Sequence, residues 1–77
     1  MSLSELMTAR AESIGYIALV GLGEHLPLQI LRSAAGYYIG TADADGPVSR
    51  ESAEYFPRQE LAAEALKTGN WQQRLEL

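Results

Sequence analysis

The sequence predicts an α+β domain, in which a small antiparallel sheet of about three strands packs against a C-terminal helix and an N-terminal helix. Three observations lead to this class. The chain has 77 residues, which is enough for one small domain, 1–77. The stretch Gly36–Trp71 contains strand-forming runs, turn residues and then a helical pattern. The first 22 residues repeat apolar side chains at the spacing of an amphipathic helix.

Residues 1–22 are predicted to be a helical extension, with a helix at about 4–20. The apolar residues at helical spacing are Leu3, Leu6, Met7, Ala11, Ile14, Ile17, Ala18 and Leu22. The polar face of this helix disappears after Ile14, so a second interpretation stays open. In that alternative the helix ends near Gly15 and a short buried strand, Tyr16–Val20, follows. We favour the continuous helix.

The core of the domain is predicted to be a β-β-β-α unit over residues 28–71. Leu28–Ser33 is its first strand, and a short connection leads from there into the second strand, Tyr37–Ala42. The second strand is rich in Tyr, Ile and Thr, which favour pleated structure. Gly40 in its interior indicates either a bulge or a close packing contact, for example beneath a helix.

A region rich in Asp, Gly and Pro follows the second strand and predicts a turn. Asp45-Gly46 is a favoured pair for a tight hairpin, and Pro47 cannot donate a hydrogen bond to a central ladder. We therefore predict that Glu51–Phe56 is the third strand and that residues 43–50 form a polar loop. The alternation of side chains leaves the register open, and a bulge near Arg50 is one way to restore it.

The C-terminal helix is predicted at about 58–68. Pro57 suits the first helical position, and Gly69 suits the left-handed residue that follows a helix. The predicted buried stripe consists of Leu61, Ala62, Ala65 and Leu66. Trp71 comes directly after the end of the helix, and we expect it to fold back onto the helix or the sheet. Residues 72–77 are predicted to be a frayed tail.

Composition argues against several classes of function. The chain has no cysteine and one histidine, His25, so we expect neither a transition-metal site nor any bound cofactor. A net charge of −4, with basic residues scattered singly, disfavours nucleic acid as a partner. The N-terminus lacks the basic region of a signal peptide, and the apolar run 14–22 is far shorter than the roughly 20 residues of a membrane span. We expect a cytoplasmic protein without a membrane partner.

Two partial motifs fail on their spacing. Gly21-Leu22-Gly23 resembles the start of a dinucleotide-binding loop, but Leu26 stands where the third glycine belongs. Asp43, Asp45 and Glu54 are arranged somewhat like a calcium-binding loop, but the glycine of that loop comes two places too early. A helix end and a solvated turn are the better interpretations of these two segments.

One surface remains as a candidate for binding. It combines the aromatic second strand with charged residues of the loop, a mixture that is typical of recognition surfaces. Its residues are Tyr37, Tyr38, Asp43, Asp45, Arg50 and Glu51. In the structural alternative, Arg50 pairs with Asp43 or Glu51 and only ties down the end of the loop.

The function predicted from these observations is that of a non-enzymatic accessory or protein-interaction module, with an unknown protein partner or a second copy of itself. No catalytic, cofactor-binding or metal-binding residues are predicted. The first alternative is single-stranded nucleic-acid binding, with bases stacked on Tyr37 and Tyr38 beside Arg50. The second alternative is a small enzyme with a site at Asp43, Arg50 and Glu51.

The region from Leu28 to Arg74 contains a series of short sequence patterns. They are GYYIGT at positions 36–41, DGP at 45–47, SRES at 49–52, EY at 54–55 and GNW at 69–71. On these patterns the chain resembles a family of short uncharacterised bacterial proteins with no assigned activity. The resemblance carries over no catalytic residues. It implies specific roles for Gly40, Asp45, Arg50, Glu51 and Trp71.

Overall fold

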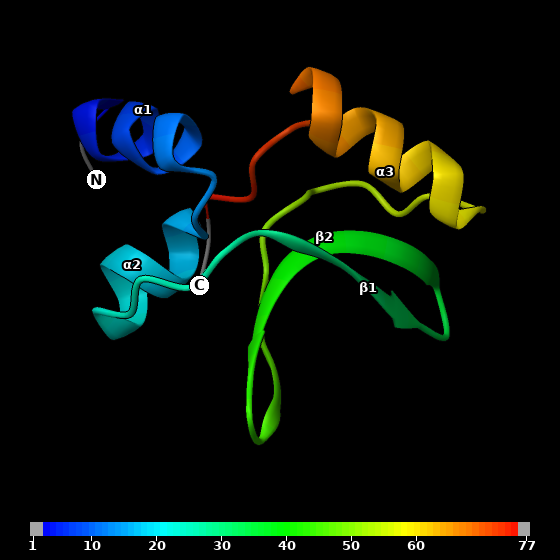
Figure 1. Cartoon of the computed structure of the whole chain (residues 1–77), viewed down its shortest axis with the longest axis horizontal. Coiled ribbons are helices and arrows are strands. Elements are labelled where there is room, and N and C mark those ends of the chain that lie inside the picture. Colours follow the sequence, from blue (N-terminus) through cyan, green and yellow to red (C-terminus); the bar gives the residue numbers. More distant parts are fainter. Residues whose placement is uncertain (1–2, 76–77) are drawn as a thin grey trace.

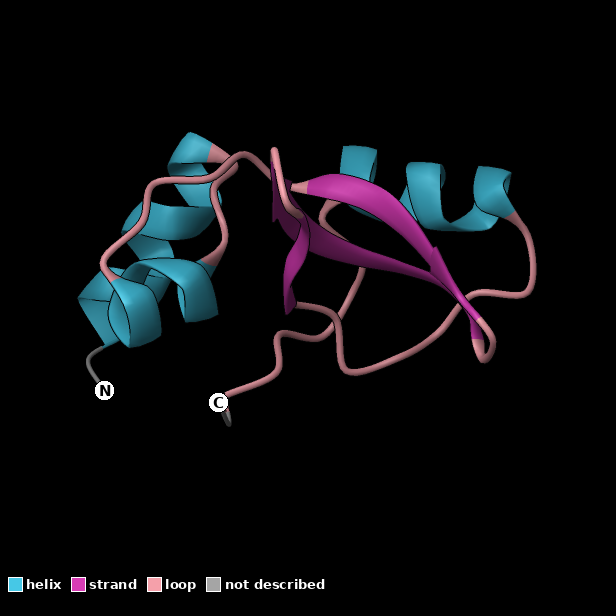
Figure 2. Cartoon of the chain, turned by 90° about the horizontal axis from the view of Figure 1, so that it is seen from below, coloured by secondary structure: helices cyan, strands magenta, loops and turns pink. Residues whose placement is uncertain are grey.

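The computed structural model describes residues 3–75 and contains three helices and three strands within them. In chain order these are α1 (Leu3–Glu12), α2 (Tyr16–Leu22), β1 (Gln29–Ser33), β2 (Gly36–Asp43), β3 (Gly46–Arg50) and α3 (Gln59–Thr68). Helices α1 and α2 lie together at one end of the sheet, and α3 contacts β1 and β2 (Figure 1 and Figure 2). The α+β class and the three-stranded antiparallel sheet are therefore confirmed.

The N-terminal part contains two helices, so the favoured continuous helix is wrong. The first helix ends before Gly15, as in the alternative, but a second helix and not a strand follows. Between the helices, Ser13 adopts a left-handed φ of 55°, and Ile14 forms a β-bridge with Pro27. Gly15 lies so close to the sheet that a Cβ on it would stand 2.5 Å from Cγ2 of Thr41. These tertiary contacts interrupt the helix at a place where the apolar periodicity continues.

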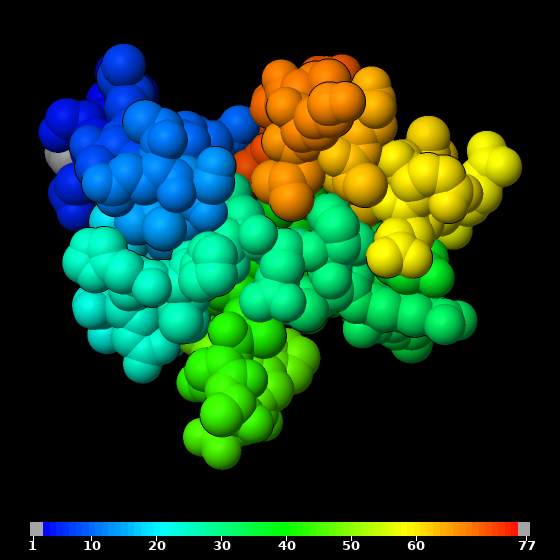
Figure 3. All heavy atoms as spheres, in the orientation of Figure 1, coloured from blue at the N-terminus to red at the C-terminus, as the bar shows by residue number. Residues whose placement is uncertain are grey.

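The sheet has the order β1-β2-β3, and both neighbouring pairs are antiparallel. β1 and β2 form the predicted hairpin, in which Ser33 pairs with Gly36 across a two-residue turn. The register of β2 against β3 shifts between Thr41 and Ala42, where Val48 is the extra residue of a bulge. The tip of the β2–β3 hairpin projects from the body of the molecule (Figure 3).

The third strand is Gly46–Arg50, not the predicted Glu51–Phe56. Pro47 is compatible with β3 because this strand lies at the edge of the sheet. It pairs with Ala42, next to the closing pair of the hairpin, so the N–H that it lacks would have pointed away from β2. The bulge is two residues before Arg50, the position near which the sequence predicts one.

Helix α3 begins at Gln59, one residue later than predicted, because Arg58 has an extended backbone with φ −137° and ψ 149°. It ends as predicted, with Gly69 in the left-handed region at φ 76°. The buried residues of α3 are Ala62 and Ala65. Leu61, which the apolar pattern places in the buried stripe, is 42% exposed.

The apolar core is divided into two clusters. The first joins α1 to α2 and consists of Ala9, Tyr16 and Ile17, flanked by Leu6, Ile14 and Val20. The second lies between the sheet and α3 and consists of Ile39, Ala65 and Trp71, flanked by Leu28, Ile30, Phe56 and Leu66. Trp71 therefore folds back as predicted. Burial raises the pKa of the Tyr16 phenol in the first cluster.

The C-terminal segment is held against the domain as far as the structure describes it. The N–H of Arg74 donates to the carbonyl of Glu51 at 2.6 Å, and the N–H of Ala53 donates to the carbonyl of Gln72 at 2.8 Å. The predicted fraying of residues 72–77 is thus not found for this part, and residues 76–77 lie outside the described residues.

Gly40 makes the close packing contact predicted from its place in β2, but with the sheet itself and not with a helix. A Cβ at this position would stand 2.8 Å from Cε2 of Tyr38 and still closer to the carbonyl oxygen of Ser49. The Tyr38 ring can lie flat over the strand because residue 40 has no side chain.

We expect Gly40→Ala to lower the free energy of unfolding by about 1–3 kcal/mol, because the added methyl group displaces either the Ser49 carbonyl or the Tyr38 ring. Urea unfolding followed by circular dichroism measures this change. Gly21→Ala, at an exposed position in α2, is the control and should raise stability by up to about 1 kcal/mol. Equal stability of Gly40→Ala and the wild type would contradict the packing argument.

Candidate interaction surface

The segment Ser49–Ser52 leads from the end of β3 toward α3 and contains the residues that the sequence singles out. Glu51 and Ser52 in this segment are completely buried. The Ser52 hydroxyl accepts a hydrogen bond from the N–H of Ile39 at 3.0 Å and donates one to the carbonyl of Glu54 at 2.9 Å. Ser52 thereby fixes the chain beside the central strand at the point where regular pairing stops.

The carboxylate of Glu51 lies at the N-terminus of α2. Its Oε1 accepts a hydrogen bond from the N–H of Ile17 at 2.9 Å, and its Oε2 accepts one from the N–H of Ala18 at 3.2 Å. The residue at the N-cap of this helix is Gly15, which has no side chain to bond these groups. Glu51 therefore caps the helix from 33 residues or more away in the sequence, where a negative charge also meets the positive end of the helix dipole.

The remaining acceptor positions of Glu51 are also filled. Ser49 donates to Oε2 at 2.5 Å, and the side-chain amide of Gln73 donates to Oε1 at 2.8 Å. Since Ser49 donates to Glu51, its contact of 2.6 Å with Thr41 has the Thr41 hydroxyl as donor. We call Thr41, Ser49, Glu51 and Gln73 the Glu51 network. Each carboxylate oxygen accepts two hydrogen bonds, so the network is a closed support for α2.

The neighbour of Glu51 in the sequence, Arg50, points to the face of the sheet that lies opposite α3. Its Nη1 donates to the carbonyls of Ser52 at 2.9 Å and Ala53 at 3.0 Å. Its guanidinium carbon lies 4.7 Å from the centre of the Tyr55 ring, a cation–π distance. The Tyr55 ring in turn meets Tyr38 edge to face, with centroids 6.0 Å apart and an interplanar angle of 78°.

Leu31 extends this group across the sheet, because it pairs with Tyr38 and the two side chains share one face. We call Leu31, Tyr38, Arg50 and Tyr55 the Arg50–Tyr55 face. Tyr55 is its most accessible aromatic ring and is 41% exposed. Alternation along β2 places Ile39, which packs toward α3, on the other side of the sheet.

The structure separates the six residues predicted as one surface. Tyr38 and Glu51 are buried, and Tyr37 lies on the α3 side of the sheet with Arg32 5.6 Å from its ring centre. Asp43 and Asp45 are at the exposed hairpin tip, where the N–H of Asp45 bonds the Asp43 carboxylate at 2.8 Å. The structural alternative, in which Arg50 pairs with Asp43 or Glu51, is wrong. Arg50 instead contacts backbone carbonyls and the Tyr55 ring.

Sequence reasoning did not include Tyr55 among the site residues. The signal for it is the pair Tyr55-Phe56, in which Phe56 joins the core on the α3 side. Phe56 also forms a β-bridge with Tyr37, so this short segment runs beside β2 with extended pairing. Neighbouring residues of an extended segment point to opposite sides, which directs Tyr55 to the open face.

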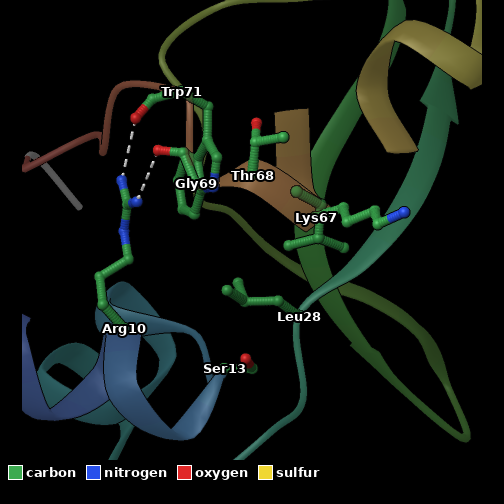
Figure 4. Close-up of a pocket in the computed structure, with 8 residues that line it drawn as sticks. Arg10, Ser13, Leu28, Lys67, Thr68, Gly69 and Trp71 are labelled. Atoms are coloured by element: carbon green, nitrogen blue, oxygen red, sulfur yellow. Dashed lines mark hydrogen bonds between the residues drawn. The ribbon is translucent and has the colours of Figure 1, made fainter. Parts of the chain in front are cut away.

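A hollow of about 270 Å³ lies between α1 and the end of α3 (Figure 4). It is lined by Arg10, Ser13, Leu28, Leu66, Lys67, Thr68, Gly69 and Trp71. Arg10 donates from Nη1 to the Gly69 carbonyl at 3.3 Å and from Nη2 to the Trp71 carbonyl at 3.0 Å, and stacks 3.7 Å above the Trp71 ring centre. It thus stabilises the C-terminal end of α3 and ties α1 to it.

The attachment of Arg10 has an electrostatic cost. Burial lowers the pKa of the Arg10 guanidinium, and the negative charge of Glu54 acts in the opposite direction. The Nε atom is buried without a hydrogen-bond partner in the described part of the chain. A second hollow of about 270 Å³, on another side of α3, is lined by Phe56, Leu61, Glu64, Ala65, Thr68 and Asn70. None of the Glu51 network lines either hollow.

Comparison of the chain with models of protein families, with curated proteins and with solved structures finds no match. The resemblance to a bacterial family therefore stays a prediction. None of the helices between residues 3 and 75 has the length and apolar character that crossing a membrane requires. Within the same residues, no three His, Asp or Glu side chains are grouped so that they could hold a metal ion.

We expect Glu51→Gln to lower the free energy of unfolding by about 2 kcal/mol, because the new amide group replaces an oxygen that accepts two hydrogen bonds. Urea unfolding measures the loss. Glu64→Gln makes the same chemical change at an exposed position of α3 and should shift stability by less than about 0.5 kcal/mol. If both variants matched the wild type, the carboxylate would not be needed for capping.

Proposed function

We propose that the protein is a non-enzymatic protein-interaction module of the cytoplasm and that it binds a partner protein through the Arg50–Tyr55 face. The observation that carries this proposal is the exposed Tyr55 ring with the Arg50 guanidinium stacked on it at 4.7 Å. Tyr and Arg are the residue types, with Trp, that most often dominate the energy of protein interfaces. The absence of cysteine is compatible with a reducing compartment.

The face is held in place before any partner arrives. Nη1 of Arg50 is fixed by two backbone carbonyls, and the Tyr55 ring is fixed between Arg50 and Tyr38. Side chains that are already ordered lose little conformational entropy when they bind. Among residues 3–75, the structure gives Arg50 no hydrogen bonds from Nε or Nη2, so these donors remain for a carboxylate or carbonyl of the partner.

The geometry gives less support to the two alternatives. Nucleic-acid binding by stacking on Tyr37 and Tyr38 needs both rings on one accessible face, but they lie on opposite faces and Tyr38 is only 8% exposed. An enzyme site at Asp43, Arg50 and Glu51 needs convergent groups, but Asp43 is at the hairpin tip and Glu51 is used in capping α2. Neither alternative has an observation in its favour.

The proposal is tested by site-specific photo-crosslinking in a bacterial cell. A photoreactive phenylalanine analogue replaces Tyr55, which keeps an aromatic ring on the face, and the control carries the analogue at Ala63, an exposed residue of α3. We expect a discrete protein adduct from position 55 that is absent from position 63. The adduct should weaken when Arg50→Ala is added, because the partner loses the guanidinium contact.

Two results would count against the proposal. One is equal crosslinking from positions 55 and 63, which would indicate random encounters. The other is a strong adduct from position 55 that does not depend on Arg50, which would show that the stacked pair is not the recognition element. Thermal unfolding of each variant controls for loss of the fold.

A further inference from the structure

The two edges of the sheet differ in how far they are protected from another strand. At the β3 edge, Pro47 removes an N–H that would face outward, and the bulge at Val48 interrupts the row of backbone groups. A helix contacts each edge strand, α2 at β3 and α3 at β1, so the difference between the edges lies in Pro47 and the bulge. β1 contains neither proline nor a bulge, and its register with β2 is continuous over all five pairs. β1 is therefore the edge to which another strand can be added.

The backbone groups that face outward from β1 can be identified from the hydrogen bonds of β2. On the side of β2 away from β1, the N–H and C=O groups of Tyr37 bond the backbone of Phe56. On the same side, the N–H and C=O groups of Ile39 bond residues 51–52. The residues of β1 that pair with these two residues of β2 are Arg32 and Ile30. In an antiparallel ladder such partners are the non-hydrogen-bonded pairs, so Ile30 and Arg32 direct their own N–H and C=O groups outward.

These outward groups have no hydrogen-bond partner within residues 3–75. The stretch with free outward groups is also short. Leu28 lies two residues before Ile30 and also directs its N–H outward, but this N–H donates to the carbonyl of Ser13 at 2.8 Å. At its other end β1 enters the two-residue turn after Ser33. What remains is a five-residue edge, Gln29–Ser33, whose two outward residues lie symmetrically on either side of Leu31.

We infer that this edge pairs with β1 of a second copy of the chain, antiparallel and with the two-fold axis at Leu31. In this register Ile30 of each copy lies opposite Arg32 of the other, and their outward groups form four backbone hydrogen bonds. The two Leu31 side chains meet on the axis, on the face that also contains Tyr38 and Tyr55. The result is a continuous six-stranded sheet in a symmetric dimer.

Other registers of the same pairing are less favourable. An axis at Arg32 places two guanidinium groups directly opposite each other, which destabilises a cross-strand pair. An axis at Ile30 requires the second copy's Arg32 to pair with Leu28, whose outward N–H already bonds Ser13. The Leu31 register avoids both problems and uses the whole free edge.

The inference goes beyond the proposed function, because it concerns the backbone edge of β1 and a second copy of the chain, although Leu31 belongs both to this edge and to the Arg50–Tyr55 face. Its test uses a matched pair of variants at one exposed position. Arg32→Pro removes the outward N–H, whereas Arg32→Ala removes the side chain and keeps it. Since this N–H takes no part in the pairing of β1 with β2, Arg32→Pro leaves the internal ladder intact, and far-ultraviolet circular dichroism and thermal unfolding check that it folds.

Sedimentation equilibrium over a dilution series measures association. We expect a dimer for the wild type and for Arg32→Ala, and dimerisation at least about tenfold weaker for Arg32→Pro, which loses two of the four hydrogen bonds. Amide hydrogen exchange of the wild type gives a second measurement that needs no variant. Exchange at Ile30 and Arg32 should slow as concentration rises, while exchange at exposed amides of the hairpin tip should not change.

A wild type that stays monomeric, with fast exchange at Ile30 and Arg32 at every concentration, would overturn the inference. So would a dimer that Arg32→Pro does not weaken, or a monomer in which these amides are protected only after an outside protein binds. The proposed function is judged separately, because Tyr55 and Arg50 variants should lose the crosslinked partner and keep the β1 dimer.

Discussion

The contact between the Glu51 carboxylate and the first turn of α2 joins the two halves of this small domain. Helix α2 has seven residues, a length at which a helix is marginal without tertiary support, and its start is buried against the sheet. The same carboxylate accepts hydrogen bonds from Ser49 and from Gln73 near the C-terminus. Removal of this group would leave buried donors unsatisfied in three separate segments, which is why the arrangement of the helices, the sheet and the tail depends on it.

A second polar contact ties the N-terminal helices to the C-terminal half. Arg10 stacks on Trp71 and donates to two carbonyls beyond the end of α3. Both contacts matter because a chain of 77 residues buries a smaller fraction of its surface than a larger domain does, and its apolar core is divided into two clusters. Hydrogen bonds and a cation–π contact between the halves supply the connection that a single large core gives to larger domains.

The segment Ser49–Ser52 contributes side chains both to the interior and to the open face of the sheet. Glu51 and Ser52 are buried and hold α2 and β2 in place, and Arg50 between them is directed to the open face of the sheet. Because Glu51 is held in place as a cap of α2, its neighbour Arg50 and the Tyr55 ring on which Arg50 stacks are held in place as well. Ordered side chains of this kind matter for the proposed interaction, because the affinity of an interface depends on a few well-placed contacts.

Sequence alone was sufficient for the α+β class, the β1–β2 hairpin, the end of α3 at Gly69 and the return of Trp71, because each rests on residues that are neighbours in the chain. It could not reveal the interruption at Ser13–Gly15, which depends on pairing with Leu26 and Leu28. It also misplaced the third strand, since proline is compatible with an edge strand and the sequence does not say which strand is at the edge. The separation of the predicted surface into a buried acid, Glu51, and a half-buried base, Arg50, likewise depends on tertiary structure. The donors that bond the Glu51 carboxylate lie up to 34 residues away in the sequence, and no local sequence pattern predicts contacts across that separation.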